Sequence, residues 1–419
     1  MSNAHAMPQG WTTIPLRYVC ELNPSIAFDG FDQDDDLTFL PMDRVKSGYF
    51  IPNTDKFSKL ASSYTAFEDG DIVLAKVTPC FENGNIAIAE DLVGGKGFGS
   101  SELFVVRPAG AERKFLFYYF QSSSFKQDGE ASMTGAGGLK RVSPDVLRRH
   151  RLPLPSVDIQ RLIANYLDRE TARIDGLIAE KERMLELLEE KRAALFSHVV
   201  TRGLDPGVPL KPSCQEWLGE IPAHWRVERA KNLFTVRDER SDDGSEELLT
   251  VSHITGVTSR SEKDVYMFEA DDKAGYKRCM PGDLAINTLW AWMGAMGISP
   301  LAGIVSPDYH VYTSKGELLP AYVDLLCRSL PFVAEVSRWS KGVWSSRLRL
   351  YPENFFEMRL PVPPHDEQAA IGRAVEEDQR KANALRESLQ LSITLAKERR
   401  AALITAAVTG QIPLEDMAS

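Results

Sequence analysis

The chain has 419 residues, 43% hydrophobic and 26% charged, which is long enough for two or three globular domains and too hydrophobic for a disordered protein. No run approaches the roughly 20 apolar residues that a membrane-spanning helix requires, so no membrane association is expected, and the first residues lack the features of a secretory signal. The net charge of −10 does not exclude nucleic-acid binding, because phosphate contact depends on local cationic clusters. The five scattered cysteines predict reduced thiols and therefore a cytoplasmic protein.

Residues 1–152 are predicted to form a first globular domain of mixed α and β structure. The short apolar runs 72–75 and 103–106 have the length and bounding residues of strands, whereas 115–121 has helical spacing. Glycine-rich stretches between such runs indicate loops. We therefore expect an α+β domain of ordinary size.

Residues 153–203 are predicted to contain a long amphipathic helix, over about 157–200. Pro153 and Pro155 block helix before it, and Gly203 with Pro206 stops it. At a rise of 1.5 Å per residue such a helix is roughly 60 Å long. Its predicted apolar seam recurs every seven residues, as a main series of Leu167, Ile174, Leu188 and Leu195 and a companion series of Ile163, Leu177 and Met184.

Residues 204–360 are predicted to hold a linker and a second mixed domain, with a strand over 305–312 and a helix over 321–329. Residues 361–419 follow with a second long helix, over about 365–408, and a tail. The seam of this helix is predicted to consist of Val375, Ala382, Leu389, Ala396 and Leu403, with Ile371 and Leu385 beside them. Helices this long and amphipathic cannot bury their stripes alone, so we expect the two to form an antiparallel coiled coil. The alternative is that both are core helices of one large domain.

The sequence repeats itself at a nearly constant offset. The run from Leu152 to Gln160 matches the run from Leu360 to Gln368, 208 residues later, and the register continues without a gap to both helix ends. The domain starts also match, since Trp11 and Trp225 lie 214 residues apart. Such repeats indicate repeated structure. The predicted fold class is therefore α+β: two mixed α/β domains joined by two long helices, with a pseudo-two-fold internal repeat.

Motifs of DNA-modifying enzymes are missing from the sequence. It contains no Asn-Pro-Pro-aromatic tetrapeptide of amino-methyltransferases, no glycine-rich cofactor fingerprint and no P-loop. The seven histidines and five cysteines have no metal-ligand spacing. The sequence therefore predicts no catalytic centre and no metal site in this chain.

Several segments resemble the specificity subunits of type I restriction-modification systems. Residues 216–225 are similar to the linker into the second domain of that family. Residues 360–371 resemble the entry into its conserved helices, and 191–195 and 399–403 resemble its helix ends. One departure is Ile159, where the second copy has Glu367 before the shared glutamine. The likeness covers essentially the whole chain.

The resemblance implies a non-catalytic subunit that reads double-stranded DNA. Each target-recognition domain would read one half of a split, asymmetric site, and the helices would set the spacer between the halves. Two methyltransferase subunits would dock on the chain, and restriction and motor subunits would complete the enzyme. S-adenosylmethionine, ATP and Mg²⁺ are expected on these partners, and no cofactor is expected on this chain.

Candidate DNA-binding residues of the first domain lie in two loops. Arg and Lys side chains read guanine, Asn and Gln read adenine, and cations also bind phosphates. The loop after the predicted strand 72–75 resembles a loop of the family, although its lysine is equally interpretable as an ordinary surface residue. A second, glycine-rich loop ends in a basic pair. The candidates are Lys76, Thr78, Asn83, Lys140 and Arg141, and the nearby Arg148, Arg149 and Arg151 either extend the basic patch or pair with acidic groups.

The candidates of the second domain occupy the corresponding places in the repeat. Trp290 and Trp292 alternate, which predicts that one lies in the core and the other is exposed. Trp344 is a further candidate for contact with the DNA backbone, and Tyr309 and His310 are weaker ones. The principal candidates are Asn287, Trp290, Ser345, Ser346, Arg347 and Arg349.

Two functions of other classes compete with DNA recognition. A coiled-coil scaffold without DNA specificity would share the helices, but would show no salt-sensitive binding to a split site. A self-contained modification enzyme would transfer methyl groups without a partner, and the missing motifs argue against it.

Overall fold

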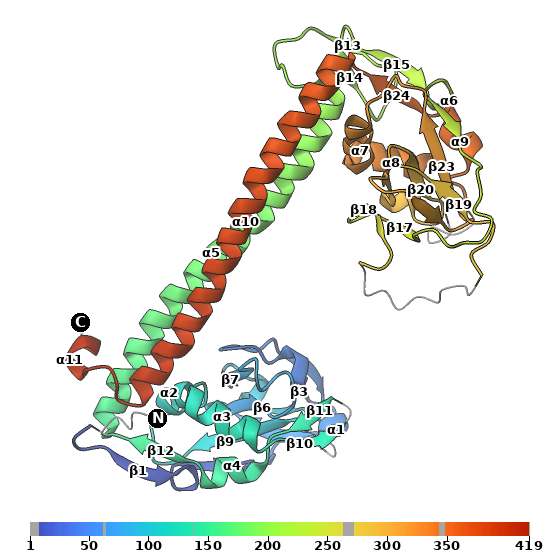
Figure 1. Ribbon diagram of the computed structural model, residues 1–419. Coiled ribbons are helices and arrows are strands. Elements are labelled where there is room, and N and C mark those ends of the chain that lie inside the picture. The colour runs from blue at the N-terminus through green and yellow to red at the C-terminus, as the bar shows by residue number, and fades with distance from the viewer. Residues whose placement is uncertain (1–7, 62–63, 137, 263–271, 343–347, 419) are drawn as a thin grey trace. The chain divides into compact units, whose positions relative to one another are not determined.

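The computed structural model describes residues 8–61, 64–136, 138–262, 272–342 and 348–418. The chain divides into two compact units (Figure 1): unit 1 consists of residues 1–182 and 390–419, and unit 2 of residues 183–389. Each unit contains one globular domain and a part of each long helix. The predicted α+β architecture, with two mixed domains and two long helices that pack together, is confirmed.

The globular domain of unit 1 contains two four-stranded sheets. The first is antiparallel and has the order β2 (Cys20–Leu22), β9 (Leu103–Pro108), β6 (Ile72–Ala75), β7 (Ile86–Ile88). The second has the order β4 (Asn53–Lys56), β3 (Asp36–Leu40), β8 (Lys96–Gly99), β5 (Thr65–Glu68). β1 (Thr12–Pro15) pairs with β12 (Arg151–Leu154), so the first and last strands of the domain meet.

Helices connect this domain to the long helices of its unit. They are α2 (Arg113–Tyr119), α3 (Ser123–Ala131) and α4 (Pro144–Arg149), with the hairpin β10 (Thr134–Ala136) and β11 (Leu139–Arg141) between the last two. Short helical turns are η1 (Leu16–Tyr18), η2 (Met42–Arg44), α1 (Phe57–Leu60) and η3 (Val93–Gly95). The Tyr118 hydroxyl of α2 donates a hydrogen bond of 2.7 Å to Asp168, which belongs to the first long helix. Because α2 also contacts β7, it lies between that sheet and the long helix.

The globular domain of unit 2 follows the same plan. Its four-stranded antiparallel sheet has the order β16 (Phe234–Val236), β23 (Tyr309–Ser314), β20 (Leu284–Asn287), β21 (Met296–Ile298). The strand pairs are β13 (Leu210–Pro212) with β14 (Glu220–Pro222), β15 (Arg226–Arg229) with β24 (Arg359–Val362), β17 (Leu249–Ser252) with β18 (Gly256–Ser259), and β19 (Lys277–Cys279) with β22 (Gly303–Val305). Its helices are α6 (Ala230–Leu233), η4 (Ala291–Met293), α7 (Pro320–Arg328), α8 (Leu330–Trp339) and α9 (Pro352–Glu357).

The sequence repeat corresponds to a repeat in topology. Strands β2, β9, β6 and β7 have the same order in their sheet as β16, β23, β20 and β21. The pair β15–β24 repeats the pair β1–β12 at the offsets that the sequence predicted for the domain start and the domain end. One predicted strand, 305–312, is instead divided between β22 and β23, because residues 306–308 form a turn closed by the Tyr309 N–H and the Ser306 carbonyl, 2.9 Å apart.

The two long helices begin at equivalent residues, and their ends differ by two residues in the register of the repeat. Helix α5 spans Val157–Arg202 and α10 spans His365–Val408. Prolines precede both, and Gly203 and Gly410 follow them with φ values of +74°, a left-handed conformation that ends helices and favours glycine. Trp225 packs against Gly203 in unit 2, and Trp11 packs against Gly410 in unit 1. The start of each domain is therefore fixed to the end of one long helix.

Interhelical ion pairs show that α5 and α10 run antiparallel. In unit 1 Arg400 pairs with Asp175 at 2.9 Å, and Lys397 lies 3.5 Å from Glu182. In unit 2 Arg386 pairs with Glu189, and Lys191 lies 3.6 Å from Asp378. Residue numbers increase along α5 as they decrease along α10 within each unit, which confirms the predicted orientation.

Part of the predicted seam is wrong. Leu167, Ile174, Leu389 and Val375 are buried as expected, but Leu177 is 43% exposed, its repeat partner Leu385 is 45% exposed, and Met184 is 44% exposed. Ile178 and Ile393 are buried. A strict seven-residue series turns away from the contact face of a 3.6-residue helix by about 20° per heptad, so the companion series leaves the seam.

Each domain core includes side chains from both long helices of its unit. In unit 1 Trp11 shares a cluster with Leu167 of α5 and Ile404 of α10, and Met417 of α11 (Leu414–Met417) closes it. In unit 2 Trp225 shares a cluster with Val200 of α5 and Ile371 of α10. Among the described helices, none is both long enough and apolar enough to cross a bilayer.

Candidate nucleic-acid interface

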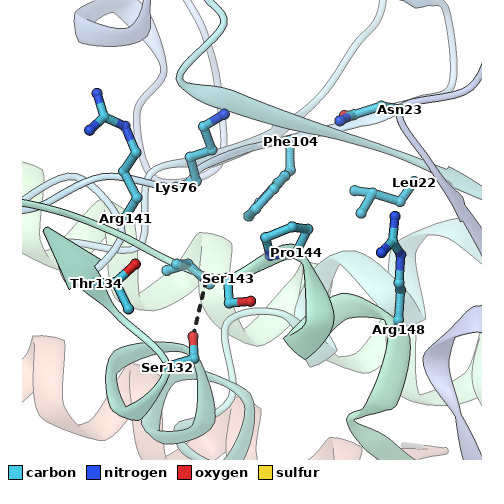
Figure 2. Close-up of a pocket in the computed structure, with 11 residues that line it drawn as sticks. Leu22, Asn23, Lys76, Phe104, Ser132, Thr134, Arg141, Ser143, Pro144 and Arg148 are labelled. Atoms are coloured by element: carbon cyan, nitrogen blue, oxygen red, sulfur yellow. Dashed lines mark hydrogen bonds between the residues drawn. The ribbon is translucent and has the colours of Figure 1, made fainter.

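A cavity of about 780 Å³ lies in the domain of unit 1, where two of the predicted residues meet (Figure 2). We call it the cationic cavity. Its wall includes Lys76 after β6, Arg141 at the end of β11 and Arg148 in α4. Figure 2 shows Lys76 and Arg141 side by side, with Arg148 on the other side of Phe104 and Pro144. The remaining lining residues are Leu22, Asn23, Ser132, Thr134, Val142 and Ser143.

Lys76 has a fixed backbone and an available charge. Its N–H donates to the Glu102 carbonyl at 3.1 Å, and its carbonyl accepts from Val142 at 2.8 Å. The ammonium lies 5.5 Å from the centre of the Phe104 ring, a cation–π distance. Within the described ranges, Lys76 has no carboxylate within salt-bridge distance. The charge of Lys76 is therefore available to an anionic ligand.

Arg141 is held by a carboxylate at the edge of the cationic cavity. Its Nε donates to Glu102 Oε2 at 2.9 Å and its Nη2 donates to Oε1 at 2.6 Å. The hydrogen bond to Glu102 raises the pKa of Arg141, and the same bond lowers the pKa of Glu102. An arginine fork that binds a carboxylate in this way also matches a phosphate or the edge of guanine. Contact with DNA would require Arg141 to exchange Glu102 for the new acceptor.

Thr78 positions the loop that carries Lys140. Its hydroxyl donates to the Gly138 carbonyl at 3.0 Å and accepts from the Lys140 N–H at 2.9 Å. Asn83 and Lys140 are exposed. The hydroxyl of Thr78 is thus occupied, whereas the side chains of Asn83 and Lys140 reach solvent.

The other arginines near the cationic cavity have partners. Arg148 and Arg149 each lie 3.7 Å from Asp145, and both are well exposed. Arg151 donates to the Thr13 carbonyl at 2.8 Å, along the β1–β12 pair. Of the two interpretations of these residues, pairing within the protein describes Arg151 best, whereas Arg148 both pairs with Asp145 and lines the cavity.

In the domain of unit 2 the predicted residues divide between core and surface. Asn287 is only 6% exposed, its amide donates to the Tyr309 hydroxyl at 3.0 Å, and its Oδ1 accepts from the Leu289 N–H at 3.2 Å. Direct contact of Asn287 with DNA is not supported by this burial, because its hydrogen-bonding groups already hold the loop. Trp290, in the same loop, is 49% exposed.

One of the two tryptophans of this loop is exposed, as predicted, but the other is half-buried rather than part of the core. The rings of Trp290 and Trp292 are stacked, with centroids 6.3 Å apart and planes at 22°. Trp292 is half-buried and its indole N–H donates to the Leu289 carbonyl at 3.1 Å. Trp290 is therefore an exposed aromatic surface whose position is fixed by the ring beneath it.

The basic segment of the second domain is described only in part. Arg349 is exposed, and its backbone pairs with Lys341 through two hydrogen bonds of 2.9 Å. The predicted residues Ser345, Ser346 and Arg347, and also Trp344, lie outside the described residues.

Tyr309 and His310 are half-buried in β23. Burial, together with the nearby Lys277 charge, lowers the pKa of His310 to about 4. Lys277 is itself buried, and its ammonium donates to the Tyr309 carbonyl at 2.6 Å. This arrangement keeps His310 neutral and within the domain, which does not favour phosphate binding.

Several structurally important residues were not identified from the sequence. Asp71 and Asp283 are buried at the start of β6 and β20, and each carboxylate binds an arginine: Arg107 at 2.8 Å in one domain and Arg237 at 2.7 Å in the other. The repeated Gly-Asp motif was the available signal. Glu367 accepts hydrogen bonds from the Trp225 indole at 3.0 Å and from His224 at 2.7 Å, which accounts for its difference from Ile159.

Part of the chain matches a known family of domains. Residues 8–187 match the family model of the type I restriction modification DNA specificity domain. The specificity subunit of the Escherichia coli type I restriction enzyme EcoAI is 36% identical over 38% of this chain and 27% of its own length, and that of EcoEI, also from Escherichia coli, is 32% identical over 44% and 30%. The matched part of the chain thus spans less than a third of these relatives.

A solved structure shows the same fold over nearly the whole chain. It comes from work on complex assembly and conformational transition of the type I R-M system, has a TM-score of 0.73 and 17% identity, and covers 97% of this chain and all of that one. The HsdS subunit from Thermoanaerobacter tengcongensis has a TM-score of 0.54 and 17% identity, over 98% of this chain and 99% of that one. The matching family model describes a DNA specificity domain rather than a catalytic one. Residues 8–187 of this chain are therefore similar to the type I restriction modification DNA specificity domain, and the chain as a whole shares the fold of these solved structures.

Proposed function

We propose that this chain selects the DNA sequence modified by a type I restriction-modification complex, with each globular domain reading one half of a split site. The observation that carries the proposal is the duplication of one domain topology, each copy fixed to the same pair of helices, in a chain whose residues 8–187 match a DNA specificity domain. A chain with two such domains has two reading surfaces. One continuous DNA site with two separated halves makes use of both.

Local charge supports DNA contact in the first domain despite the net charge of −10. Lys76, Arg141 and Arg148 line one cavity, and exposed Lys140 lies beside Arg141 in β11. Phosphates are bound by local clusters of cations rather than by the average charge of a protein. We assign phosphate and base contact in the first half-site to this cavity and to the adjacent residues Thr78 and Asn83.

The second domain offers different chemistry at the corresponding place. After β20 the chain presents the Trp290 ring, where the first domain presents the Lys76 ammonium after β6. An aromatic face stacks on an exposed base or on a sugar, while an ammonium binds an anion or guanine. Domains that differ in this way would read different half-sites, so the whole site would be asymmetric. Arg349 and the predicted residues 345–347 would add backbone contacts.

The helix pair is proposed as the docking surface for two methyltransferase subunits. Leu177 and Leu187 are exposed on α5, and their repeat partners Leu385 and Leu395 are exposed on α10. Leu177 and Leu395 belong to unit 1, and Leu187 and Leu385 belong to unit 2, so each unit has an exposed leucine from each long helix. Exposed apolar residues often mark protein-binding surfaces. Because these occur at equivalent positions of both repeats, the chain offers two similar surfaces, which suit two copies of the same partner.

The partners would supply the chemistry of the complex. Methyltransferase subunits would hold S-adenosylmethionine, and restriction subunits would hold ATP and Mg²⁺, so this chain would need no cofactor of its own. The five cysteines are free thiols, as expected for a complex that acts on DNA in a reducing cytoplasm.

Sequencing of methylated DNA tests the proposal. Cells that express the chain with its methyltransferase partner are compared with cells that express the partner alone and with cells that express the chain alone. We expect N6-methyladenine in one split, asymmetric motif only when the chain is present. A stable complex of both proteins without such a motif would favour the coiled-coil scaffold, and methylation by the chain alone would favour a self-contained enzyme.

A further inference from the structure

Two buried glutamines connect the start of each long helix to the domain that precedes it. Gln160 lies in the first turn of α5 and is 1% exposed, and Gln368 lies in the first turn of α10 and is fully buried. Burying a primary amide is costly unless its donor and its acceptor both find partners. Both glutamines find them within their own unit.

The partners are equivalent in the two copies. Gln160 Oε1 accepts from the backbone N–H of Glu112 at 2.7 Å, and its Nε2 donates to the Pro155 carbonyl at 2.8 Å. Gln368 Oε1 accepts from the backbone N–H of Leu319 at 2.7 Å, and its Nε2 donates to the Pro363 carbonyl at 2.8 Å.

Each amide therefore links the peptide that enters a long helix to the start of a helix in the preceding domain. Glu112 is the N-cap of α2 and Leu319 is the N-cap of α7, whereas one residue separates Pro155 and Pro363 from the long helices. The apolar core that each domain shares with its long helices resists their separation but has little directional preference. Hydrogen bonds through a planar amide are directional, so they add a fixed angle to this contact. The neighbouring position differs between the copies, with Ile159 in one and Glu367 in the other. Gln368 Nε2 also donates to the Glu317 carbonyl at 3.0 Å, but the two contacts described above occur in both copies.

We infer that Gln160 and Gln368 are positioning residues that fix the angle between each domain and its long helix, and thereby the gap at which the two DNA half-sites are read. The inference rests on the proposed function, because the gap has a meaning only for a split site. Neither glutamine is exposed, so neither contacts DNA. Loss of the amide leaves the part-buried N–H of Glu112 or Leu319 without its acceptor, and a small movement of the domain would return that group to water.

Methylation at altered gaps tests the inference in the complex with the methyltransferase. Gln160→Met and Gln368→Met remove both hydrogen bonds at similar side-chain volume. The rate of methylation is measured on DNA with the native gap and with gaps one base pair shorter and longer. We expect the ratio of the native rate to the rates at the altered gaps to fall at least fivefold in each variant. Gln390→Met, at an exposed position of α10, is the matched control and should keep the wild-type ratio.

A purely structural role has a different signature. It would lower the rate equally at all three gaps, in step with the melting temperature, and that outcome overturns the inference, as does an unchanged ratio in both variants. Hydrogen exchange of the full chain without DNA gives an independent result: the Glu112 amide in Gln160→Met and the Leu319 amide in Gln368→Met should exchange at least tenfold faster, while β6 and β20 remain protected. If the wild-type complex methylates no split site, the proposed function fails and the role in setting the gap fails with it, and the exchange of these two amides then decides only whether the glutamines fix each domain to its long helix.

Discussion

At the scale of single residues, Lys76 is the strongest candidate for contact with DNA in the first domain. Its ammonium lies in the cationic cavity without a salt-bridge partner among the described residues, and its backbone is fixed on both sides. Lys76→Gln should weaken binding of the assembled complex to the first half-site. If Lys76 contacts a phosphate, the loss of affinity is the same for all DNA sequences, and the slope of log K against log salt concentration falls by about one. If it contacts a base, the loss of binding free energy is about 1–3 kcal/mol, and the complex discriminates less between bases at one position of the half-site.

Equilibrium binding at several salt concentrations measures this effect. Lys59→Gln is the matched control, because Lys59 is an exposed lysine of the same domain that pairs with Asp55 and does not line the cavity. Wild-type affinity and salt slope in Lys76→Gln would contradict the assignment of the cavity.

Trp290 is the corresponding residue of the second domain. Its exposed ring is supported by Trp292, so stacking on a base would cost little ordering of the side chain. Trp290→Ala should weaken binding to the second half-site by about 1–3 kcal/mol, the usual effect of removing one base–aromatic stack. Trp290→Phe keeps an aromatic face and should retain most of the affinity.

The affinities of the wild-type complex and of the two Trp290 variants are compared on DNA in which only one half-site is intact. An equal loss for Trp290→Ala at both half-sites would argue against a local stack, as would equal losses for the alanine and phenylalanine variants.

Sequence reasoning at this scale located loops better than it assigned roles within them. Lys76 and Arg141 were predicted from residue type and position, and the structure brings them to one cavity. Asn287 was predicted by the same argument, yet its amide is buried and hydrogen-bonded to Tyr309 and Leu289. The sequence carries no sign of this difference, because whether an amide faces solvent depends on a partner that lies 22 residues away, the Tyr309 hydroxyl.

At the scale of elements, the exposed leucines of the long helices are the surface most open to a protein partner. Leu177→Ser and Leu385→Ser should each weaken the docking of one methyltransferase subunit, because a fully buried leucine contributes about 1.5–3 kcal/mol. Native mass spectrometry should show a shift from two bound subunits toward one in each single variant. The double variant should bind neither tightly.

Leu210→Ser provides the matched control, since Leu210 is a similarly exposed leucine of β13 that lies outside both long helices. Because exposed substitutions rarely change stability by more than about 0.5 kcal/mol, the variants should fold normally. Two subunits bound with wild-type affinity in the double variant would exclude this docking surface.

The same leucines show where a periodic pattern ceases to be informative. The ends of α5 and α10 were predictable, since prolines precede and glycines follow both helices. The choice between Leu177 and Ile178 for the seam was not, because both are apolar and adjacent, and only the local twist of the helix pair decides between them. The residue that the periodicity placed wrongly in the seam is therefore the one now proposed to contact a partner.

At the scale of the whole molecule, the internal repeat was the most predictive property of the sequence. A constant offset over the helices required two equivalent long helices, and the matched tryptophans before each domain required equivalent domain starts. The strand order inside the domains was not predictable, because it depends on pairs such as β2 with β9 that lie more than 80 residues apart. DNA-reading residues are also hardest to derive where the two copies differ most.

The helices also allow the proposed spacer function to be tested by their length. Seven residues added to both helices, after Leu185 in α5 and after Leu389 in α10, preserve the heptad register and leave the Glu182–Lys397 and Glu189–Arg386 pairs on their own sides of the insertion. At 1.5 Å per residue the insertion lengthens each helix by about 10.5 Å. At roughly 3.4 Å per base pair, the preferred gap should grow by about three base pairs, while both half-site sequences stay the same.

Sequencing of methylated DNA from cells that carry the lengthened chain measures the gap directly. The same insertion in α5 alone offsets the two seams by seven residues and should abolish methylation rather than change the gap. If the double insertion methylates the original motif with its original gap, the helices do not set the spacing. A new gap with altered half-sites would mean that the insertion changed the reading domains themselves, because the bases recognised depend on each domain and not on the length of the helices between them.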